Sequence, residues 1–191
     1  MDYKAVVIGG SAGSFQIVTK ILASLPRTFN IPIFLCLHRL KHIRSGFDEA
    51  LSIKSVLPVV EPMDKEYVRN GKIYLAPANY HMYVEIGSQI ALSTEEVVNH
   101  SRPSIDLCFY SAAYTYKEKA VGILLSGANR DGATGLKLIR DQGGLTIAQA
   151  PDDCQVKTMT TVAIKEGAAE MILTADEIVS FLSKLVDENK Q

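Results

Sequence analysis

The sequence predicts an α/β fold, in which a doubly wound, mostly parallel sheet is flanked by helices and carries a small antiparallel β-meander. Four apolar runs, each too short for a buried helix, alternate with segments of helical apolar spacing: Ala5–Ile8, Ile31–Leu37, Ala120–Leu125 and Leu145–Gln149. Strands that alternate with helices favour right-handed crossovers and therefore a parallel sheet. At 191 residues, and with no repeat or obvious linker, the chain is expected to form one domain over residues 1–191.

The first half of the chain begins with a strand that ends at Gly9-Gly10. The apolar spacing from Phe15 to Leu22 predicts a helix, which Leu25-Pro26 closes. After the second apolar run we expect a short helix over 45–54 and a strand over 56–60. The turn signal Asn70-Gly71 precedes three short segments, which are interpreted as the antiparallel meander: 72–76, 80–86 and 89–92.

The second half continues the alternation of helices and strands. A helix is expected from Ser101 to about Tyr116, with Ser101 as its cap and Pro103 in its first turn. Later helices are expected over 132–140, closed by Gly143-Gly144, then near 157–166, and finally over about 175–189.

Composition restricts the classes of function. The net charge is −1, which gives no general affinity for nucleic acid or acidic lipid. No run approaches the roughly 20 apolar residues of a membrane-spanning helix, so membrane insertion is not expected. The three cysteines have no CxxC spacing, and no signal peptide precedes the first strand. These features predict a reducing, cytoplasmic setting.

Three polar residues follow three of the predicted strands: Ser11, His38 and Asp131. The carboxyl ends of parallel strands lie at one edge of a sheet, where ligands and chemistry gather. A serine hydroxyl becomes a good nucleophile when an imidazole accepts its proton, and a carboxylate then orients that imidazole. The pattern is therefore compatible with a Ser-His-Asp triad.

Each of these residues also has a simpler interpretation. Ser11 lies in a glycine-rich turn before a helix, where caps and phosphate contacts are more frequent than nucleophiles, and Asp131 could cap the helix that follows it. His38 and His42 have a spacing that could hold a metal, but no acidic third ligand stands nearby. A nucleotide-binding site is disfavoured because Gly9–Ser14 lacks the G-x-G-x-x-G spacing and no Walker lysine-serine pair is present.

Six sequence blocks, in order, resemble the catalytic domain of the CheB-type chemotaxis protein-glutamate methylesterases and glutamine deamidases. The most specific is GILLSGANRDGATGL, which contains Asp131. The others are IGGSAG around Ser11, Leu37-His38, Ala76-Pro77 through His81-Met82, RPSID at 102–106, and TIAQ at 146–149. The chain departs from the family pattern near the site: Ala128 replaces a methionine, and Arg39-Leu40-Lys41 lacks the usual proline.

The resemblance implies that Ser11 is the nucleophile, His38 the general base and acid, and Asp131 the orienting carboxylate. It further implies oxyanion donors at the backbone N–H groups of His38 and Ala128. The expected substrates are γ-glutamyl methyl esters, and some glutamines, on the cytoplasmic helices of methyl-accepting chemoreceptors. Neither a metal nor an organic cofactor is implied.

The receiver domain that usually precedes this catalytic domain is not expected in residues 1–191. We therefore expect either constitutive activity or control by a separate receiver-domain protein. The alternative function is a catalytically silent binding module of the same fold in chemosensory signalling.

Overall fold

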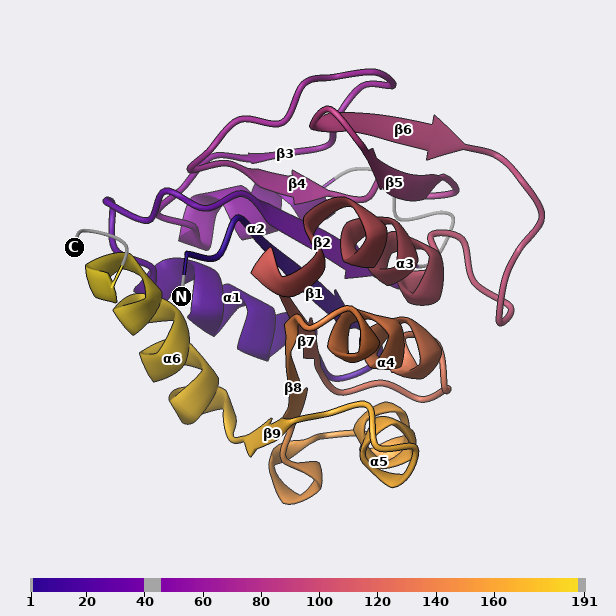
Figure 1. Cartoon of the computed structure of the whole chain (residues 1–191). Helices are drawn as coiled ribbons and strands as arrows, with labels where there is room; N and C mark the ends of the chain where they lie inside the picture. Colours follow the sequence, from indigo (N-terminus) through magenta and orange to yellow (C-terminus); the bar gives the residue numbers. More distant parts are fainter. Residues whose placement is uncertain (1, 40–45, 189–191) are drawn as a thin grey trace.

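A seven-stranded sheet lies between two layers of helices in the computed structural model, which describes residues 2–39 and 46–188 (Figure 1). The strand order is β3-β4-β2-β1-β7-β8-β9, and every neighbouring pair is parallel. The chain therefore starts in the middle of the sheet and winds outward in both directions, as predicted for a doubly wound fold.

The seven strands of the main sheet are β1 (Ala5–Gly10), β2 (Ile33–Leu37), β3 (Val59–Val60), β4 (Ile73–Leu75), β7 (Ala120–Leu124), β8 (Leu145–Gln149) and β9 (Met171–Leu173). A separate antiparallel pair consists of β5 (His81–Glu85) and β6 (Gln89–Ser93). The α-helices are α1 (Phe15–Ser24), α2 (Phe47–Lys54), α3 (Ile105–Tyr116), α4 (Ala133–Asp141), α5 (Thr158–Lys165) and α6 (Ala175–Glu188). Within the described residues, no helix combines the length and the apolar character that crossing a membrane requires.

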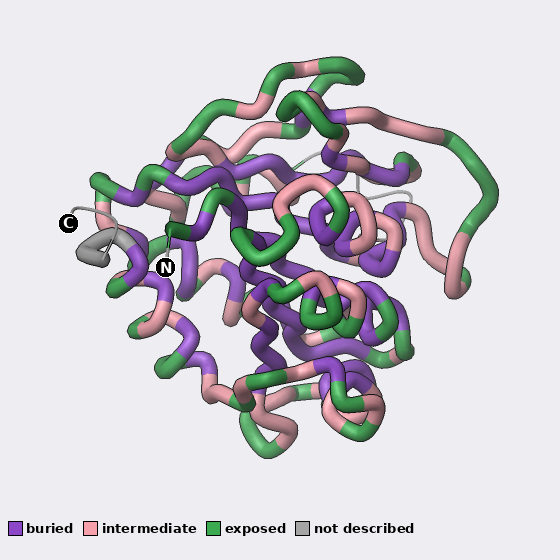
Figure 2. The backbone as a smooth tube through the Cα atoms, viewed as in Figure 1, coloured by how far each residue is buried: buried purple, intermediate pink, exposed green. Residues whose placement is uncertain are grey.

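The two faces of the sheet support two hydrophobic cores, which Figure 2 shows as buried backbone between the helices. Side chains alternate along a strand, so Val6 and Ile8 of β1 enter the core under α1 and α6, whereas Val7 enters the core under α3 and α4. Because both faces are covered, the central strands are apolar throughout, as a parallel sheet requires.

The predicted meander is smaller than expected. The segment predicted over 72–76 is β4, which pairs in parallel with β2 and β3 and belongs to the main sheet. Of the three predicted segments, the other two are β5 and β6, which form an antiparallel pair that packs on α3, where the Val84 N–H donates to Ser111 Oγ at 2.9 Å. The apolar pattern of 72–76 fits either sheet, and only its distant partners decide between them.

Helix α3 begins later than predicted. Its cap is Ser104 rather than Ser101, because the Ser104 hydroxyl accepts a hydrogen bond from the Leu107 N–H at 3.4 Å. Ser101 instead forms an isolated bridge with Val98. This shift frees the Ser101 hydroxyl from helix capping and leaves it beside His38.

Three smaller differences concern short elements. The strand predicted over 56–60 is reduced to β3, and β9 was not predicted because three apolar residues carry too little pattern. The helix predicted from residue 45 is described from Phe47, and Ser45 lies outside the described residues.

Candidate functional site

The loops that carry the three predicted site residues follow three adjacent strands. Ser11 comes directly after β1, His38 directly after β2, and Asp131 lies in the loop between β7 and α4. In the sheet β1 lies between β2 and β7, and both pairings are parallel. The carboxyl ends of these strands therefore bring the three loops to one edge of the sheet.

His38 and Asp131 form a direct pair across 93 positions of sequence. His38 Nε2 lies 2.8 Å from Asp131 Oδ2, and the two side chains are 13% and 0% exposed. A carboxylate at this distance fixes the proton on Nε2 and leaves Nδ1 as the acceptor nitrogen. The pair therefore provides an oriented imidazole with a free basic nitrogen.

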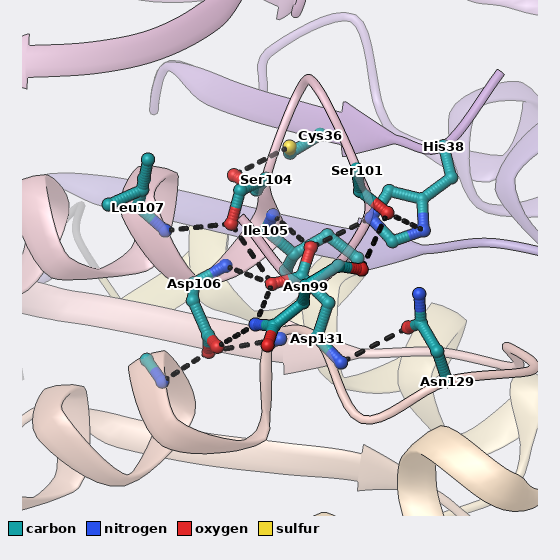
Figure 3. Close-up of polar contacts among 12 residues, drawn as sticks. Cys36, His38, Asn99, Ser101, Ser104, Ile105, Asp106, Leu107, Asn129 and Asp131 are labelled. Carbon is teal, nitrogen blue, oxygen red and sulfur yellow. Dashed lines mark hydrogen bonds and ion pairs between the residues drawn. The ribbon is translucent and has the colours of Figure 1, made fainter. Parts of the chain in front are cut away.

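The Asp131 carboxylate accepts hydrogen bonds from five donors (Figure 3). Besides His38, these are Asn99 Nδ2 at 3.0 Å, Ser104 Oγ at 3.0 Å, and the backbone N–H groups of Ile105 at 2.7 Å and Asp106 at 3.1 Å. Burial acts to raise the pKa of Asp131, but hydrogen bonds from His38, Asn99 and Ile105 hold that pKa below its usual value. The carboxylate is thus kept ionised although it is buried.

Asp131 does not cap α4, the helix that follows it, because Gly132 occupies the capping position and the Asp131 carboxylate faces the other way. It instead lies at the start of α3. Asp106 of α3 reciprocates, since its Oδ1 accepts from the N–H groups of Gly132 at 3.0 Å and Gly135 at 2.7 Å. Each helix is therefore capped by a carboxylate from the other helix or its leading loop.

Asp106, the second carboxylate of this network, has a pKa that is shifted in the opposite direction from that of Asp131. Burial, together with the neighbouring charge of Asp131, raises the pKa of Asp106 to about 6. Asn99 bridges the two carboxylates, because its Nδ2 also donates to Asp106 Oδ2 at 2.8 Å. Asn99 holds this position with a positive φ of 50°, which asparagine tolerates better than most residues.

Hydrogen bonds to the next loop hold the turn that carries Ser11. The Ser11 N–H donates to the Ser126 carbonyl at 2.9 Å, and the Ser14 hydroxyl donates to the Ser11 carbonyl at 2.7 Å. The buried Ser126 hydroxyl also donates to the Ala12 carbonyl at 2.8 Å. Gly13 completes the turn with a φ of +80°, and a Cβ there would lie 2.6 Å from Gln155 Cβ. The backbone around Ser11 is thus fixed on several sides.

A cavity of about 380 Å³ opens beside these loops. Its lining residues are Ser11, Ala12, His38, Arg39, His100, Ser101, Arg102 and Pro103. Ser11 and His38 share this cavity, although no hydrogen bond joins their side chains in the described chain. Long or missing hydrogen bonds between nucleophile and base are common before substrate binds.

A second hydroxyl lies closer to the base. Ser101 Oγ is 3.4 Å from His38 Nδ1 and 3.4 Å from the Asn99 carbonyl oxygen. The sequence interpretation had assigned Ser101 to a helix cap and had given Asn99, Ser104 and Asp106 no role in the site. The RPSID block contains Ser104 and Asp106, so the signal was present, but nothing local in it indicates that both would meet Asp131.

The two backbone N–H groups predicted as oxyanion donors differ in availability. The His38 N–H donates to the Gly10 carbonyl at 3.1 Å, which continues the hydrogen-bond ladder between β1 and β2. This donor is therefore occupied in the present structure, and the oxyanion role of His38 stays a prediction. Within the described residues, the N–H of Ala128 has no hydrogen-bond partner, so it remains available.

The metal interpretation of the sequence involved His42, which lies outside the described residues. Among the residues that are described, no group of three or more histidine, cysteine or acidic side chains has the arrangement of a metal site.

Comparison with known proteins identifies related sequences along nearly the whole chain. A family model described as CheB methylesterase matches residues 6–182. A putative protein-glutamate methylesterase/protein-glutamine glutaminase of Leptospira interrogans is 36% identical over 189 residues, which cover 99% of this chain and 98% of the relative. Protein-glutamate methylesterase FrzG of Myxococcus xanthus is 34% identical over 97% of this chain and 55% of its own length.

The chain spans about half the length of some relatives, and its fold is similar to that of a solved catalytic domain. The chain matches 53% of the Clostridium acetobutylicum protein-glutamate methylesterase/protein-glutamine glutaminase, at 32% identity over 96% of this chain. The crystal structure of the Thermotoga maritima CheB methylesterase catalytic domain superposes with a TM-score of 0.90 and 31% identity, covering 97% of this chain and 100% of that one. The fold predicted from the sequence is thereby confirmed.

Proposed function

The chain belongs to the CheB methylesterase family, and from this membership we propose that it is a serine hydrolase that removes methyl esters from glutamate side chains. The observation that carries the proposal is the 2.8 Å pair between His38 Nε2 and Asp131 Oδ2, beside a cavity that Ser11 also lines. This arrangement supplies the oriented base and the hydroxyl that acyl transfer requires.

In the proposed first step, the γ-carbonyl of a methylated glutamate enters the cavity beside Ser11. The Ser11 oxygen attacks the carbonyl carbon while His38 Nδ1 takes the hydroxyl proton, and Asp131 stabilises the resulting imidazolium. Backbone N–H groups donate hydrogen bonds that stabilise the negative charge on the tetrahedral oxygen, and among these donors we assign Ala128. Collapse of the tetrahedral species breaks the bond to the methoxy group, and His38 returns the proton so that methanol leaves.

In the second step, water replaces methanol. His38 removes a proton from a water molecule, whose oxygen attacks the acyl-Ser11 ester and restores the serine hydroxyl. The overall reaction consumes one ester and one water and yields glutamate, methanol and a proton. A glutamine side chain enters the same sequence of steps with ammonia as its leaving group, which is the deamidation that the names of the relatives include.

We propose that the substrates are the cytoplasmic helices of methyl-accepting chemoreceptors and that the chain acts in the cytoplasm. We also propose that residues 1–191 form one catalytic unit, which needs no receiver domain for turnover and is open to control by a separate receiver-domain protein.

The decisive test is methanol release from methylated receptor helices by the unaltered chain and by Ser11→Ala. We expect the variant to lose roughly 10⁴-fold or more in kcat, because removal of a triad member has effects of this size. Ser24→Ala is the matched control, since Ser24 is exposed at the end of α1 and should leave the rate unchanged. Equal, measurable rates for Ser11→Ala and the unaltered chain would contradict Ser11 as the nucleophile, whereas no methanol from either folded protein would favour the silent binding module.

A further inference from the structure

The wall of the active-site cavity carries two guanidinium groups and no carboxylate. Arg39 and Arg102 both line the cavity, together with Ser11, His38 and His100. No aspartate or glutamate is among the described residues that line it. A methyl ester is neutral, so the reacting group itself does not account for the Arg102 charge, which, unlike that of Arg39, has no carboxylate partner among the described residues.

Arg39 is buried but incompletely paired. Its side chain is 1% exposed, and Nη2 donates to Glu61 Oε1 at 2.5 Å and to the Ala76 carbonyl at 2.7 Å. Its Nε and Nη1 are buried without a hydrogen-bond partner in the described part of the chain. A buried N–H without an acceptor is costly, so an acceptor brought by a ligand would be favoured there.

Arg102 is fully held yet retains its charge. Its Nη1 donates to the carbonyls of Thr94 and Glu95, both at 2.6 Å, while Nε and Nη2 donate to Asn79 Oδ1 at 3.2 and 2.9 Å. All these acceptors are neutral, and Arg102 makes no ion pair among the described residues. Its orientation is therefore fixed while its positive charge stays uncompensated.

Both arginines contact the same short segment of the chain, residues 76–79. Arg39 binds the carbonyl of Ala76, and Arg102 binds the side chain of Asn79, three residues later. The segment 76–79 therefore ties the two guanidinium groups together, and both belong to one cavity. A carboxylate that entered this cavity would meet the Arg102 guanidinium, which has no counter-ion among the described residues, and the Arg39 guanidinium, which is already paired with Glu61.

We propose that Arg39 and Arg102 form a carboxylate subsite, which binds an acidic side chain lying within one helical turn of the esterified glutamate. This inference rests on the proposed function and specifies its substrate as an acidic helix rather than any methyl ester. The subsite holds the neighbouring carboxylate, and the ester is thereby placed at Ser11.

The test uses two helical peptides, each with a single γ-methyl glutamate. They are identical except that the flanking residues within one turn are glutamate in one peptide and glutamine in the other. For the unaltered chain we expect kcat/KM, measured by methanol release, to be at least about tenfold higher for the glutamate-flanked peptide. We expect added salt to reduce this preference, because the interaction is between charges.

Arg39→Gln and Arg102→Gln should each bring the ratio of the two kcat/KM values toward one, while Arg39→Lys, which keeps the charge, should retain part of it. Arg27→Gln is the matched control and should keep the full ratio, because Arg27 lines a different cavity near Asp2 and Asn30. If a variant instead lost kcat/KM for both peptides in equal proportion, the arginine would act on the ester reaction itself rather than on the flanking carboxylate, and this result would overturn the subsite.

The comparison in the unaltered chain remains decisive if a variant does not fold. Equal kcat/KM for the two peptides overturns the subsite and leaves the esterase proposal standing. Methanol release from neither peptide, by folded protein, removes the proposed function and the subsite with it.

Discussion

The two ring nitrogens of His38 have different neighbours, and this difference gives Ser101 a role other than the helix cap that the sequence indicated. Nε2 pairs with Asp131, while Nδ1 faces Ser101 Oγ at 3.4 Å. The Ser101 hydroxyl can donate to a neutral Nδ1 or, by turning toward the Asn99 carbonyl, accept a hydrogen bond from a protonated one. Ser101 is therefore expected to position the imidazole in both of its protonation states.

Ser101→Ala should lower kcat by about threefold to tenfold and change KM less than about twofold. One ordinary hydrogen bond is worth roughly 0.5–1.5 kcal/mol, and about 1.4 kcal/mol corresponds to a tenfold change in rate. Steady-state methanol release measures both constants, with Ser24→Ala as the control. A loss as deep as that of Ser11→Ala would contradict a positioning role and would identify Ser101 as the nucleophile.

Asp106 gives the folded chain a specific pH dependence. Burial raises its pKa from 3.8 to about 6, so between about pH 4 and pH 6 the folded state binds this proton more tightly than the unfolded state. The free energy of unfolding therefore receives a contribution that falls as the pH rises through this window. Asp131 has a lowered pKa and contributes with the opposite sign, and its contribution is lost only as the pH falls below its usual pKa.

Urea unfolding between pH 5 and pH 7 measures this effect. The other groups of the chain contribute alike to both proteins, so the informative quantity is the difference between the unaltered chain and Asp106→Asn. We expect the unaltered chain to gain stability relative to the variant on going from pH 7 to pH 5. Identical slopes in the two proteins would show that Asp106 does not titrate in this window.

At the scale of elements, α3 and α4 hold each other's amino ends. Asp131 binds the first N–H groups of α3, and Asp106 binds the Gly132 and Gly135 N–H groups at the start of α4. The helices pack closely because Gly135 has no side chain: a Cβ there would lie 2.6 Å from Phe109 Cβ and 2.8 Å from the Asp106 carbonyl oxygen. The geometry of Asp131 therefore depends on this helix contact.

Gly135→Ala should destabilise the fold by about 1–3 kcal/mol, the usual cost of overpacking, despite the better helix propensity of alanine. It should also lower methanol release, because α3 carries the donors that hold Asp131. Thr134→Ala is the matched control, since Thr134 is exposed in the same helix and should change stability by less than about 0.5 kcal/mol. Denaturant titration tests this, and equal midpoints for the two variants would contradict the close packing.

At the scale of elements, the local apolar pattern of the sequence is sufficient to predict some strands and not others. The strands β1, β2, β7 and β8 were predicted because a short apolar run buried on both faces is a local signal. Segment 72–76 was assigned to the meander because sheet membership depends on distant partners, here β2 and β3. The start of α3 was misplaced because Ser101 and Ser104 are both good caps, and tertiary contacts selected Ser104.

For the whole molecule, residues 1–191 are expected to unfold as one cooperative unit. Two hydrophobic cores cover the opposite faces of one continuous sheet. Because both cores include side chains of the same strands, loss of the helices on one face would expose strands that also support the other core. Circular dichroism in the far ultraviolet follows all helices and strands, whereas tyrosine fluorescence reports on Tyr3 and on seven tyrosines between Tyr67 and Tyr116. The two transitions should coincide because the chain unfolds as one unit. Separated transitions would contradict a single unit.

The whole fold also explains how much of the site could be predicted. Strand ends share one edge in any parallel sheet, so the sequence placed Ser11, His38 and Asp131 together without knowing their distances. Four of the five donors on Asp131 lie in residues 99–106, and Ser101 of the same segment is 63 positions from His38 in the sequence. No local pattern encodes such a contact.

The direction of β1 has a practical consequence. The strand begins at Ala5 on one edge of the sheet and delivers Ser11 to the other, and its six residues span roughly 20 Å. A purification tag or a fused reporter joined ahead of Ala5 would therefore start on the side away from the cavity. Immobilising the protein through that end should leave the entrance open to a bulky helical substrate.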